Sequence, residues 1–373
     1  MAVAPETIQT IARLTPLADV LAMVERDVKP VAPCSVELGA AAGRILAVDA
    51  AAPTRPNSAL ALLDGWAFSA DATLGAGGYS PALLPMVPPR VEVGEAMPPG
   101  SDCVAPFDAV KLAGSRAEAL ANVNPGDGVL PTGGDCEAGL ALRRAGERMR
   151  AIDSAAFAAA GIARVTVREP RIRVLPLRGS DIVNAAARLV ASDIERRGGA
   201  AQLDDAGRDL GAALAAENAD AIVAIGGTGQ GRNDSSVQTL ARAGRLAVHG
   251  IALTPGETAA FGFVGSRPVL LLPGRLDAAL SVWLLLGRRL LERLAAAAEE
   301  SEAVETLPLA RKVVSTVGLA ELVPVRRNAG TAEPLASKYL SLTVLARADG
   351  WMLVPADSEG YAAGTPVRLR SWP

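Results

Sequence analysis

Residues 221–234, AIVAIGGTGQGRND, decide the fold of this chain. Five apolar residues come first, a run that is typical of a buried strand. Four glycines follow within six residues, and a helical pattern begins at Asp234. A strand, a glycine-rich turn and a helix in this order predict a loop at the carboxyl end of a sheet strand, where α/β proteins bind ligands.

The same alternation continues on both sides of this stretch. Apolar runs of strand length alternate with segments of helical length between residues 171 and 300. We expect strands at 171–177, 200–203, 221–225, 245–251 and 268–272, and helices at 182–197, 207–217, 234–243 and 277–298. This order predicts a largely parallel sheet with helices on both faces.

The rest of the chain has a different character. A helix is predicted to begin with Thr15 as its N-cap and to end before Lys29. Prolines and glycine-rich turns separate short β-like runs in residues 51–135, which predicts a small β domain. Residues 153–167 predict a helix and then a strand, and residues 301–373 return to a β pattern.

The composition excludes several classes of protein. Half of the residues are hydrophobic but only 3% are aromatic, so the core must be built from alanine, leucine and valine. Lysine and arginine number 37 and aspartate and glutamate 40, a net charge of −3 that argues against a general nucleic-acid-binding protein. His249 is the only histidine, and Cys34, Cys103 and Cys136 form no CxxC pair, which excludes a histidine-rich zinc site and a zinc knuckle.

Nothing in the sequence predicts secretion or membrane insertion. The N-terminal residues are amphipathic and include acids, unlike a signal peptide, which has a basic start and a continuous apolar run. The most apolar stretch is residues 278–287, whereas a helix that spans a bilayer needs about 20 residues. With scattered cysteines that are expected to be reduced, the chain is predicted to be cytoplasmic, with no membrane or nucleic-acid partner.

Two loops of the predicted α/β region are candidates for binding a ligand. Residues 226–234 expose backbone N–H groups ahead of a helix, which suits a phosphate, although the spacing is neither GxGxxG nor a P-loop. The alternative is a tight turn in which Asp234 caps the helix. Residues 272–277, LPGRLD, also join a strand to a helix. Arg275 could meet an anion there, or Asp277 could cap the helix.

Acidic residues in the β-rich region are candidate cation ligands. Asp64 lies in the Asp-Gly turn of LLDGWAF, and Asp135 and Glu137 lie in the glycine-rich TGGDCEAG. Each alone is typical of an ordinary turn. Together, carboxylates from separate loops could hold a hard cation such as Mg²⁺ beside a phosphate. We interpret His249 as a strand-end residue with satisfied hydrogen bonds rather than as a catalyst.

Taken in order, these motifs resemble the MoeA-type molybdopterin molybdenumtransferase family, which includes the gephyrin E domain. TPLADVL and the later LLDGWAF resemble the family's N-terminal stretch, which ends in serine-alanine-methionine-aspartate-glycine-tyrosine-alanine. TGGDCEAG resembles its arginine-x-x-glycine-glutamate-aspartate-isoleucine loop, and GGTGQGRND its glycine-glycine-valine-serine-x-glycine-x-x-aspartate loop. Residues 248–280 resemble, in order, three further segments of the family: histidine-glycine-valine, proline-glycine-lysine-proline and leucine-proline-glycine-asparagine-proline.

This resemblance implies a fold and an activity. Family members insert molybdate into the dithiolene of adenylylated molybdopterin, with release of AMP and the aid of a divalent cation such as Mg²⁺. The implied fold is α/β plus β, and its domains are a split N-terminal domain (1–50 and 136–170), an inserted β domain (51–135), a three-layer, MogA-like α/β molybdopterin-binding domain (171–300) and a C-terminal β domain (301–373). The family is typically a homodimer whose site lies between the α/β domain of one subunit and the β domain of the other.

The resemblance also implies site residues and partners. Asp64, Asp135 and Asp234 fall on acidic positions of the family, and Asp64 and Asp234 are the candidate metal ligands. The candidate cofactor-binding positions are Gly226, Gly227, Gly229, Gly231, Pro255, Gly256, Pro273, Gly274 and Arg275. The implied protein partners are a pterin-adenylylating protein and a client molybdoenzyme.

The sequence also departs from the family pattern. The serine-threonine-glycine-aspartate-glutamate motif is missing after the first α/β strand, where RIRVLPLRGSDIVN stands instead. Gly229 replaces a serine, Glu257 replaces a lysine, and Arg275-Leu276 replaces asparagine-proline. Three hypotheses therefore stay open: an active molybdenum insertase, a non-catalytic paralogue that binds pterin or delivers the cofactor to a molybdoenzyme, and a scaffolding homodimer.

Overall fold

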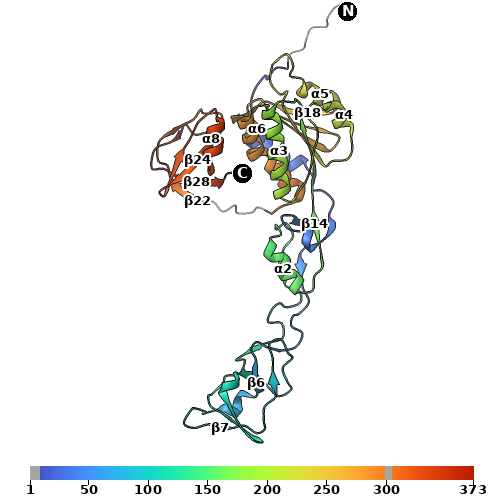
Figure 1. The fold of residues 1–373 in the computed structure, drawn as a ribbon. Coiled ribbons are helices and arrows are strands. Elements are labelled where there is room, and N and C mark those ends of the chain that lie inside the picture. The colour runs from blue at the N-terminus through green and yellow to red at the C-terminus, as the bar shows by residue number, and fades with distance from the viewer. Residues whose placement is uncertain (1–8, 299–304) are drawn as a thin grey trace, which may run out of the picture. The chain divides into compact units, whose positions relative to one another are not determined.

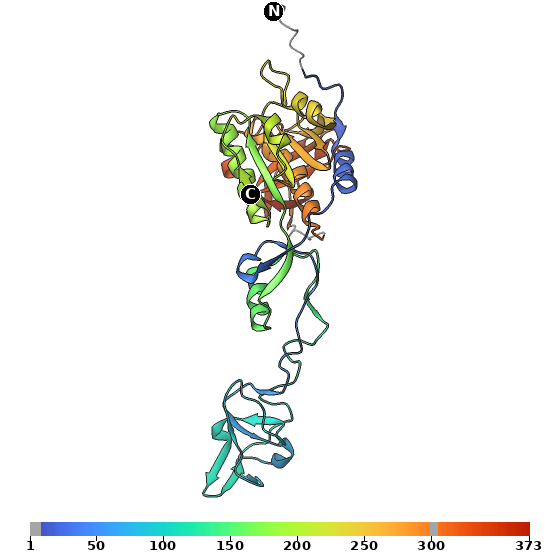
Figure 2. The ribbon, with the colours of Figure 1, turned by 90° about the vertical axis from the view of Figure 1, so that its right-hand side faces the viewer.

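The computed structural model describes residues 9–298 and 305–373. The chain divides into two compact units, and Figures 1 and 2 show their elements in two views. The first unit consists of Met1–Val48, Ala145–Arg150 and Thr166–Pro373, and the second of Asp49–Arg144 and Ala151–Val165.

A six-stranded sheet with the order β16-β15-β17-β21-β20-β18 forms the centre of the first unit. Its strands are β15 (Arg171–Pro176), β16 (Ala200–Leu203), β17 (Ala221–Ile225), β18 (Arg245–His249), β20 (Ala260–Val264) and β21 (Arg267–Leu272). The first four in the spatial order are parallel, whereas β20 and β18 are antiparallel. The prediction of a largely parallel sheet is confirmed, but the strand β20 and the antiparallel edge were not predicted.

Helices cover both faces of this sheet. Successive strand residues face opposite sides, so Val223 packs into one hydrophobic core and Ala224 into the other. One face carries α1 (Leu17–Asp27), α3 (Asp181–Arg196), α6 (Leu276–Val282) and α7 (Arg288–Ala295), and the other carries α4 (Leu210–Ala215) and α5 (Ser236–Ala243). Figure 1 shows α3 beside α6 and α4 beside α5. This is the three-layer α/β fold that the alternating pattern predicts.

The helix predicted over residues 277–298 is divided by a π-helical turn, Trp283–Gly287, between α6 and α7. Gly287 leaves room for the indole of Trp283, since a Cβ at this glycine would lie 2.1 Å from Trp283 Cε3. Trp283 is fully buried in the core of the first unit. Across the two described ranges, no helix combines the length and apolar character needed to cross a membrane.

The strand predicted over residues 245–251 is confirmed as far as His249, and its predicted end at residue 251 is wrong. β18 ends at His249, and a separate strand, β19 (Ile251–Thr254), pairs in a different sheet. Gly250 lies between them with a φ of +93°, a conformation that favours glycine and redirects the chain. The same second sheet contains β1 (Thr15–Pro16), so Thr15 is a strand residue and Pro16 is the N-cap of α1.

The predicted alternatives for two helix caps are also wrong. Asp234 does not cap α5, because Ser235 is the N-cap residue and makes no side-chain cap hydrogen bond. Asp277 lies in the first turn of α6, whose N-cap is Arg275. Each carboxylate binds an arginine instead: Asp234 binds Arg178 from within the loop, and Asp277 binds Arg275 from the first turn of α6.

The second sheet of the first unit is formed mainly by the C-terminal region, with the order β1-β19-β24-β26-β28-β22 and β25 paired with β24. Its C-terminal strands are β22 (Glu305–Pro308), β24 (Ala320–Asn328), β25 (Thr331–Pro334), β26 (Gly350–Val354) and β28 (Pro366–Ser371). α8 (Leu342–Arg347) contacts β24. Smaller sheets join β23 (Val313–Val314) to β27 (Gly360–Tyr361), and β2 (Cys34–Glu37) to β14 (Arg164–Arg168) and β3 (Ile45–Leu46). The predicted β character of this region is confirmed.

The second unit is built from short strands. Two three-stranded sheets, β8-β6-β9 and β10-β11-β7, and two strand pairs, β12-β5 and β13-β4, make up its β structure. The elements are β4 (Ala50–Ala51), β5 (Leu60–Ala61), β6 (Gly65–Phe68), β7 (Ala82–Leu83), β8 (Arg90–Val91), β9 (Cys103–Ala105), β10 (Val110–Ala113), β11 (Arg116–Ala119), β12 (Val129–Leu130), β13 (Ala141–Arg143) and α2 (Ala151–Ala159). Gly65 is the first residue of β6. A Cβ there would lie 2.0 Å from the carbonyl oxygen of Ala105, so close packing requires a glycine in this Asp-Gly turn.

A buried carboxylate ties α3 to the helices beside it. Asp193 is 2% exposed, and its Oδ2 accepts hydrogen bonds from Trp283 Nε1 at 2.7 Å and Arg288 Nε at 2.8 Å. Arg288 Nη2 donates to the other oxygen at 3.0 Å. Burial alone would raise the pKa of Asp193, but the hydrogen bonds and charge of Arg288, helped by Trp283, hold this pKa well below its ordinary value.

Asp193→Asn should lower the free energy of unfolding by about 3 kcal/mol at pH 7, since it leaves the buried Arg288 guanidinium without its counter-charge. The folded-state pKa of Asp193 is depressed, so the stabilisation is present above the unfolded-state pKa of about 4 and is lost as the pH falls toward the folded-state value. Urea unfolding at pH 7 and pH 3 should therefore show a smaller difference between the two proteins at pH 3. Equal stabilities at pH 7 would contradict this role.

Candidate functional site

Two loops that the sequence singles out begin side by side at the carboxyl edge of the six-stranded sheet. β17 pairs with β21 in parallel, and the last pair in register is Ile225 with Leu272. The glycine loop (Gly226–Asp234) follows β17, and the Pro-Gly loop (Pro273–Arg275) follows β21. The N–H of Gly226 donates to the carbonyl of Leu272 at 2.8 Å, and a Cβ on Gly274 would lie 3.5 Å from Gly226 Cα. The two candidate loops therefore start from neighbouring strands of the sheet.

The start of the glycine loop requires glycine for its backbone conformation. Gly226 and Gly227 have φ values of +104° and +73°. The carbonyl of Gly227 then turns toward α5, where it accepts hydrogen bonds from Ser236 Oγ at 2.7 Å and from the N–H of Ser236 at 3.1 Å. The loop therefore folds back onto the helix that follows it.

Two side chains from distant segments hold the middle of the loop. Gln9 Nε2 donates to the carbonyl oxygens of Gly227 and Gly229, both at 2.7 Å. His249 Nε2 lies 3.1 Å from the carbonyl oxygen of Thr228, to which it donates in the tautomer with hydrogen on that nitrogen. The interpretation of His249 as a satisfied strand-end residue is confirmed. Gln9 was missed, because nothing in the local sequence marks it.

Asp234 shapes the end of the glycine loop. Its Oδ2 accepts a hydrogen bond from the N–H of Gly231 at 2.9 Å, and its Oδ1 accepts one from Arg178 Nη2 at 2.8 Å. The same arginine nitrogen donates to the carbonyl of Asn233 at 2.6 Å. The N–H of Gly231 is therefore used inside the loop, which leaves the earlier residues of the loop to meet a ligand.

A third predicted segment reaches the glycine loop through one hydroxyl contact. Thr258 Oγ1 lies 3.0 Å from Thr228 Oγ1. Just before it, Pro255 and Gly256 are buried. Gly256 has a φ of +139°, and a Cβ on it would lie 2.6 Å from Val282 Cγ2. This segment is packed against α6, and Thr258 connects it to the loop.

Part of the Arg275 guanidinium is hydrogen-bonded to Asp277. Its Nε and Nη2 donate to the two carboxylate oxygens of Asp277 at 3.1 and 2.5 Å, and its guanidinium carbon lies 5.1 Å from the ring centre of Tyr339. The hydrogen bonds that Arg275 donates to Asp277 raise the pKa of Arg275, burial opposes this, and the charges of Asp277 and Glu257 add to the increase. The prediction that Arg275 meets an anion stays a prediction. The side chain is 57% exposed, with two of its three nitrogens bound to Asp277.

The predicted acidic residues do not form a cluster within the described chain. Asp64 and Asp135 are exposed residues of the second unit; Asp64 Oδ1 accepts the N–H of Val93 at 2.8 Å, and the N–H of Asp135 donates to the carbonyl of Arg55 at 3.0 Å. Residues 9–298 and 305–373 contain no group of three or more histidine, cysteine, aspartate or glutamate residues that could hold a metal. The described residues of one chain therefore bring no such cluster together, and the assignment of Asp64 and Asp234 as metal ligands stays a prediction.

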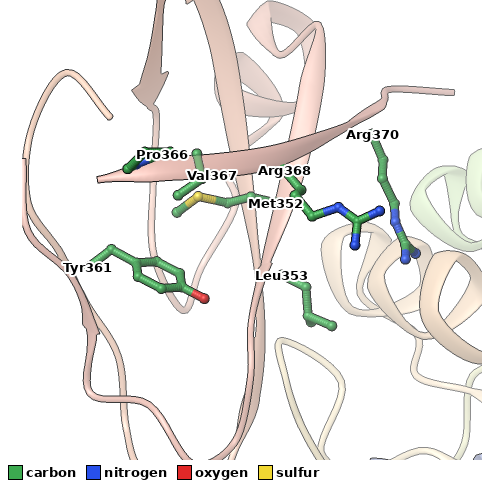
Figure 3. Close-up of a pocket in the computed structure, with 7 residues that line it drawn as sticks. All are labelled: Met352, Leu353, Tyr361, Pro366, Val367, Arg368 and Arg370. Atoms are coloured by element: carbon green, nitrogen blue, oxygen red, sulfur yellow. The ribbon is translucent and has the colours of Figure 1, made fainter. Parts of the chain in front are cut away.

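A separate cavity of about 310 Å³ lies on the C-terminal sheet (Figure 3). It is lined by Met352, Leu353, Tyr361, Pro366, Val367, Arg368 and Arg370. The guanidinium carbon of Arg370 lies 5.0 Å from the ring centre of Trp351. The cavity shares no residue with the loops described above, so it is no part of the candidate site.

Three family models match the chain in order. The MoeA N-terminal region (domain I and II) matches residues 15–161, a probable molybdopterin binding domain matches residues 175–293, and the MoeA C-terminal region (domain IV) matches residues 306–372. The chain belongs to the MoeA family. The middle match contains both loops of the candidate site, and membership of this family places the protein in molybdenum cofactor biosynthesis.

Known proteins support this MoeA assignment. A protein of Methanocaldococcus jannaschii, provisionally named for molybdopterin biosynthesis, is 25% identical over 369 residues, which is 89% of this chain and 90% of the relative. The crystal structure of a molybdopterin biosynthesis MoeA protein from Pyrococcus horikoshii is 26% identical, has a TM-score of 0.79 and is matched over 97% of this chain and 100% of its own. A molybdenum cofactor biosynthesis protein from Pyrococcus furiosus, 21% identical over 96% of this chain and 99% of its own with a TM-score of 0.61, shares the fold.

Gly226→Ala should destabilise the protein by about 1–2 kcal/mol, because φ at this position is +104° and an L side chain rarely adopts it. Gly274→Ala is the matched control, since its added methyl would make an ordinary contact 3.5 Å from Gly226 Cα. Urea unfolding of both variants measures the difference. A loss of stability in Gly274→Ala as large as in Gly226→Ala would show that crowding, rather than backbone strain, limits the loop.

Proposed function

We propose that this MoeA-family chain inserts molybdate into adenylylated molybdopterin, with release of AMP. The observation that carries the proposal is the pairing of the glycine loop with the Pro-Gly loop at the carboxyl ends of adjacent parallel strands. Ligands of open α/β sheets bind at this edge, and glycine-rich backbone suits the close approach of phosphate.

In this proposal the backbone supplies most of the attraction for phosphate. Arg275 and the exposed Arg232 add positive charge at the site, and Arg275 has a third guanidinium nitrogen beyond the two that bind Asp277. Glu257, which stands where the family has a lysine, opposes an anionic ligand. Its charge acts on Arg275, so it weakens the field that a phosphate would meet.

The proposal includes a homodimer, in which Asp64 and Asp135 approach the glycine loop of the other subunit. The support is the resemblance of these two acidic loops to those of the family. Mg²⁺ belongs to the proposal only as an added ion, because a single chain brings no cluster of ligands together in its described residues. A pterin-adenylylating protein, a client molybdoenzyme and a cytoplasmic location are likewise proposed from the resemblance and the sequence.

The second candidate function is binding or delivery of the pterin cofactor without insertion chemistry. Its specific support is the Arg275–Asp277 pair, in which a buried carboxylate takes two donors that an anion would otherwise use. The missing acidic motif after β15 also supports binding or delivery without insertion chemistry. A scaffolding homodimer is the third candidate, and it differs from the other two because it requires no pterin ligand.

Expression of this chain in a strain that lacks its own molybdenum insertase should restore molybdoenzyme activity, if the proposed reaction is correct. The purified protein should also release AMP from adenylylated molybdopterin when molybdate is added, with Mg²⁺ present and absent. Binding of the pterin without AMP release would support the delivery function. A protein that binds neither the pterin nor AMP would support the scaffold and contradict both pterin functions.

Glu257→Lys should tighten AMP binding about fivefold, because the substitution adds two units of positive charge beside Arg275. Glu257→Gln should give a smaller gain. Glu217→Lys, an exposed position that precedes β17 at the opposite edge of the sheet, is the control for net charge. Titration calorimetry at low salt measures all four proteins. An equal gain in AMP affinity from Glu217→Lys would mean that the net charge of the protein, rather than the charge beside Arg275, causes the change.

A further inference from the structure

Gln9 makes three hydrogen bonds at the glycine loop although it lies more than 200 residues away in the sequence. It is 5% exposed, and its Nε2 donates to the carbonyls of Gly227 and Gly229. Its Oε1 accepts the N–H of Val237 at 3.2 Å. We propose that Gln9 is a positioning residue for phosphate recognition, a role that rests on the proposed function and identifies which backbone groups bind the ligand.

The argument begins with the geometry of the peptide bond. In a trans peptide, the carbonyl of one residue and the N–H of the next point in opposite directions. The carbonyl of Gly227 points toward Gln9, so the N–H of Thr228 points away from it. The carbonyl of Gly229 also points toward Gln9, so the N–H of Gln230 points away as well.

The residues that carry these two N–H groups differ in burial: Gln230 is exposed, whereas Thr228 is 1% exposed, at the base of the loop. Among residues 9–298 and 305–373, neither the N–H of Thr228 nor that of Gln230 donates a hydrogen bond. His249 fixes the peptide between them, because its ring nitrogen binds the carbonyl of Thr228. Gln9 and His249 therefore hold three successive carbonyls of the loop, while the N–H groups of Thr228 and Gln230 stay without a partner in the described residues.

Gln9 also removes one competing site. Phosphates often bind the first N–H groups of a helix, and α5 begins directly after the loop. Its first two donors are already used, because the N–H of Ser236 binds the carbonyl of Gly227 and the N–H of Val237 binds Gln9. A phosphate at this site therefore meets the N–H groups of the loop, on the side opposite Gln9, and not the start of the helix.

A fixed loop binds more tightly than a mobile one, because the ligand does not have to order it. Glycine-rich backbone is otherwise the most flexible kind of chain, with the largest entropy to lose. The three hydrogen bonds of Gln9 order this segment before the ligand arrives. Loss of the side chain should therefore weaken ligand binding more than it weakens the fold.

Three variants test the role with AMP as the probe. Gln9→Met keeps the size of the side chain and removes all three hydrogen bonds, and Gln9→Glu keeps the acceptor for Val237 but places a carboxylate against two carbonyls. Gln202→Met is the matched control, since Gln202 is exposed and its side chain accepts a hydrogen bond from Asn218, away from the loop. We expect AMP affinity to fall about tenfold in Gln9→Met and further in Gln9→Glu at pH 8, and to stay unchanged in Gln202→Met.

A pH profile separates positioning from general loss of structure. The carboxyl of Gln9→Glu is buried against carbonyls, so its pKa should be raised, and at pH 5.5 its protonated form can donate one hydrogen bond. Its AMP affinity relative to wild type should therefore recover severalfold between pH 8 and pH 5.5, and that of Gln9→Met should not. The AMP phosphate titrates in the presence of every protein, so its effect cancels in these ratios.

Each outcome either supports or overturns the positioning role of Gln9. Wild-type affinity in Gln9→Met would overturn the proposal, and tighter binding would show that Gln9 occupies the place of the ligand. The proposed function fails only if the wild type binds neither AMP nor the pterin. If the wild type binds no AMP, nuclear spin relaxation of the Thr228 and Gln230 amides in the free protein decides the role of Gln9. Rigid amides in wild type that become mobile in Gln9→Met support it, and equally mobile amides in both proteins overturn it.

Discussion

The parallel pairing of β17 with β21 is the constraint on which the candidate site depends. The register ends with Ile225 opposite Leu272, so the two loops start at the same level of the sheet. A shift of one residue would exchange the faces of an entirely buried strand and separate the loops. Because Gly226 and Gly274 have no side chains, the two backbones lie close enough to make one surface. The third segment then needs only the contact between Thr258 and Thr228 to join it.

The charges around this edge explain why backbone donors matter in this chain. Asp277 is almost fully buried, and the N–H groups of Ala278 and Leu340 bind its carboxylate together with Arg275. This arrangement fixes the position of Arg275 but neutralises much of its charge. Glu257 adds a second negative charge nearby. In the proposed function, the attraction for an anion therefore depends on the oriented N–H groups of the loop more than on side-chain cations.

The parts of the fold that local patterns determine could be predicted from the sequence. β16 and β17 were placed correctly because each is an isolated apolar run between turn residues. The end of the strand predicted over 245–251 was wrong because Gly250 changes the direction of the chain without interrupting the apolar pattern. Asp234 was wrong as a cap because Arg178, from a distant loop, binds its carboxylate. Contacts of this kind have no signal in the neighbouring residues.

Gln9 is the clearest case of such a contact, and the structure explains why an N-terminal segment can act at this site. The segment is held in place by the parallel pairing of β1 with β19 and by the hydrogen bond from the N–H of Thr15 to the carbonyl of Gly250. Gly250 must lack a side chain here, since a Cβ would lie 2.5 Å from Ile11 Cγ2. The glycine that separates β18 from β19 therefore also makes room for the segment that carries Gln9. Because His249 precedes this glycine, the same short stretch aligns both side chains that bind the loop carbonyls.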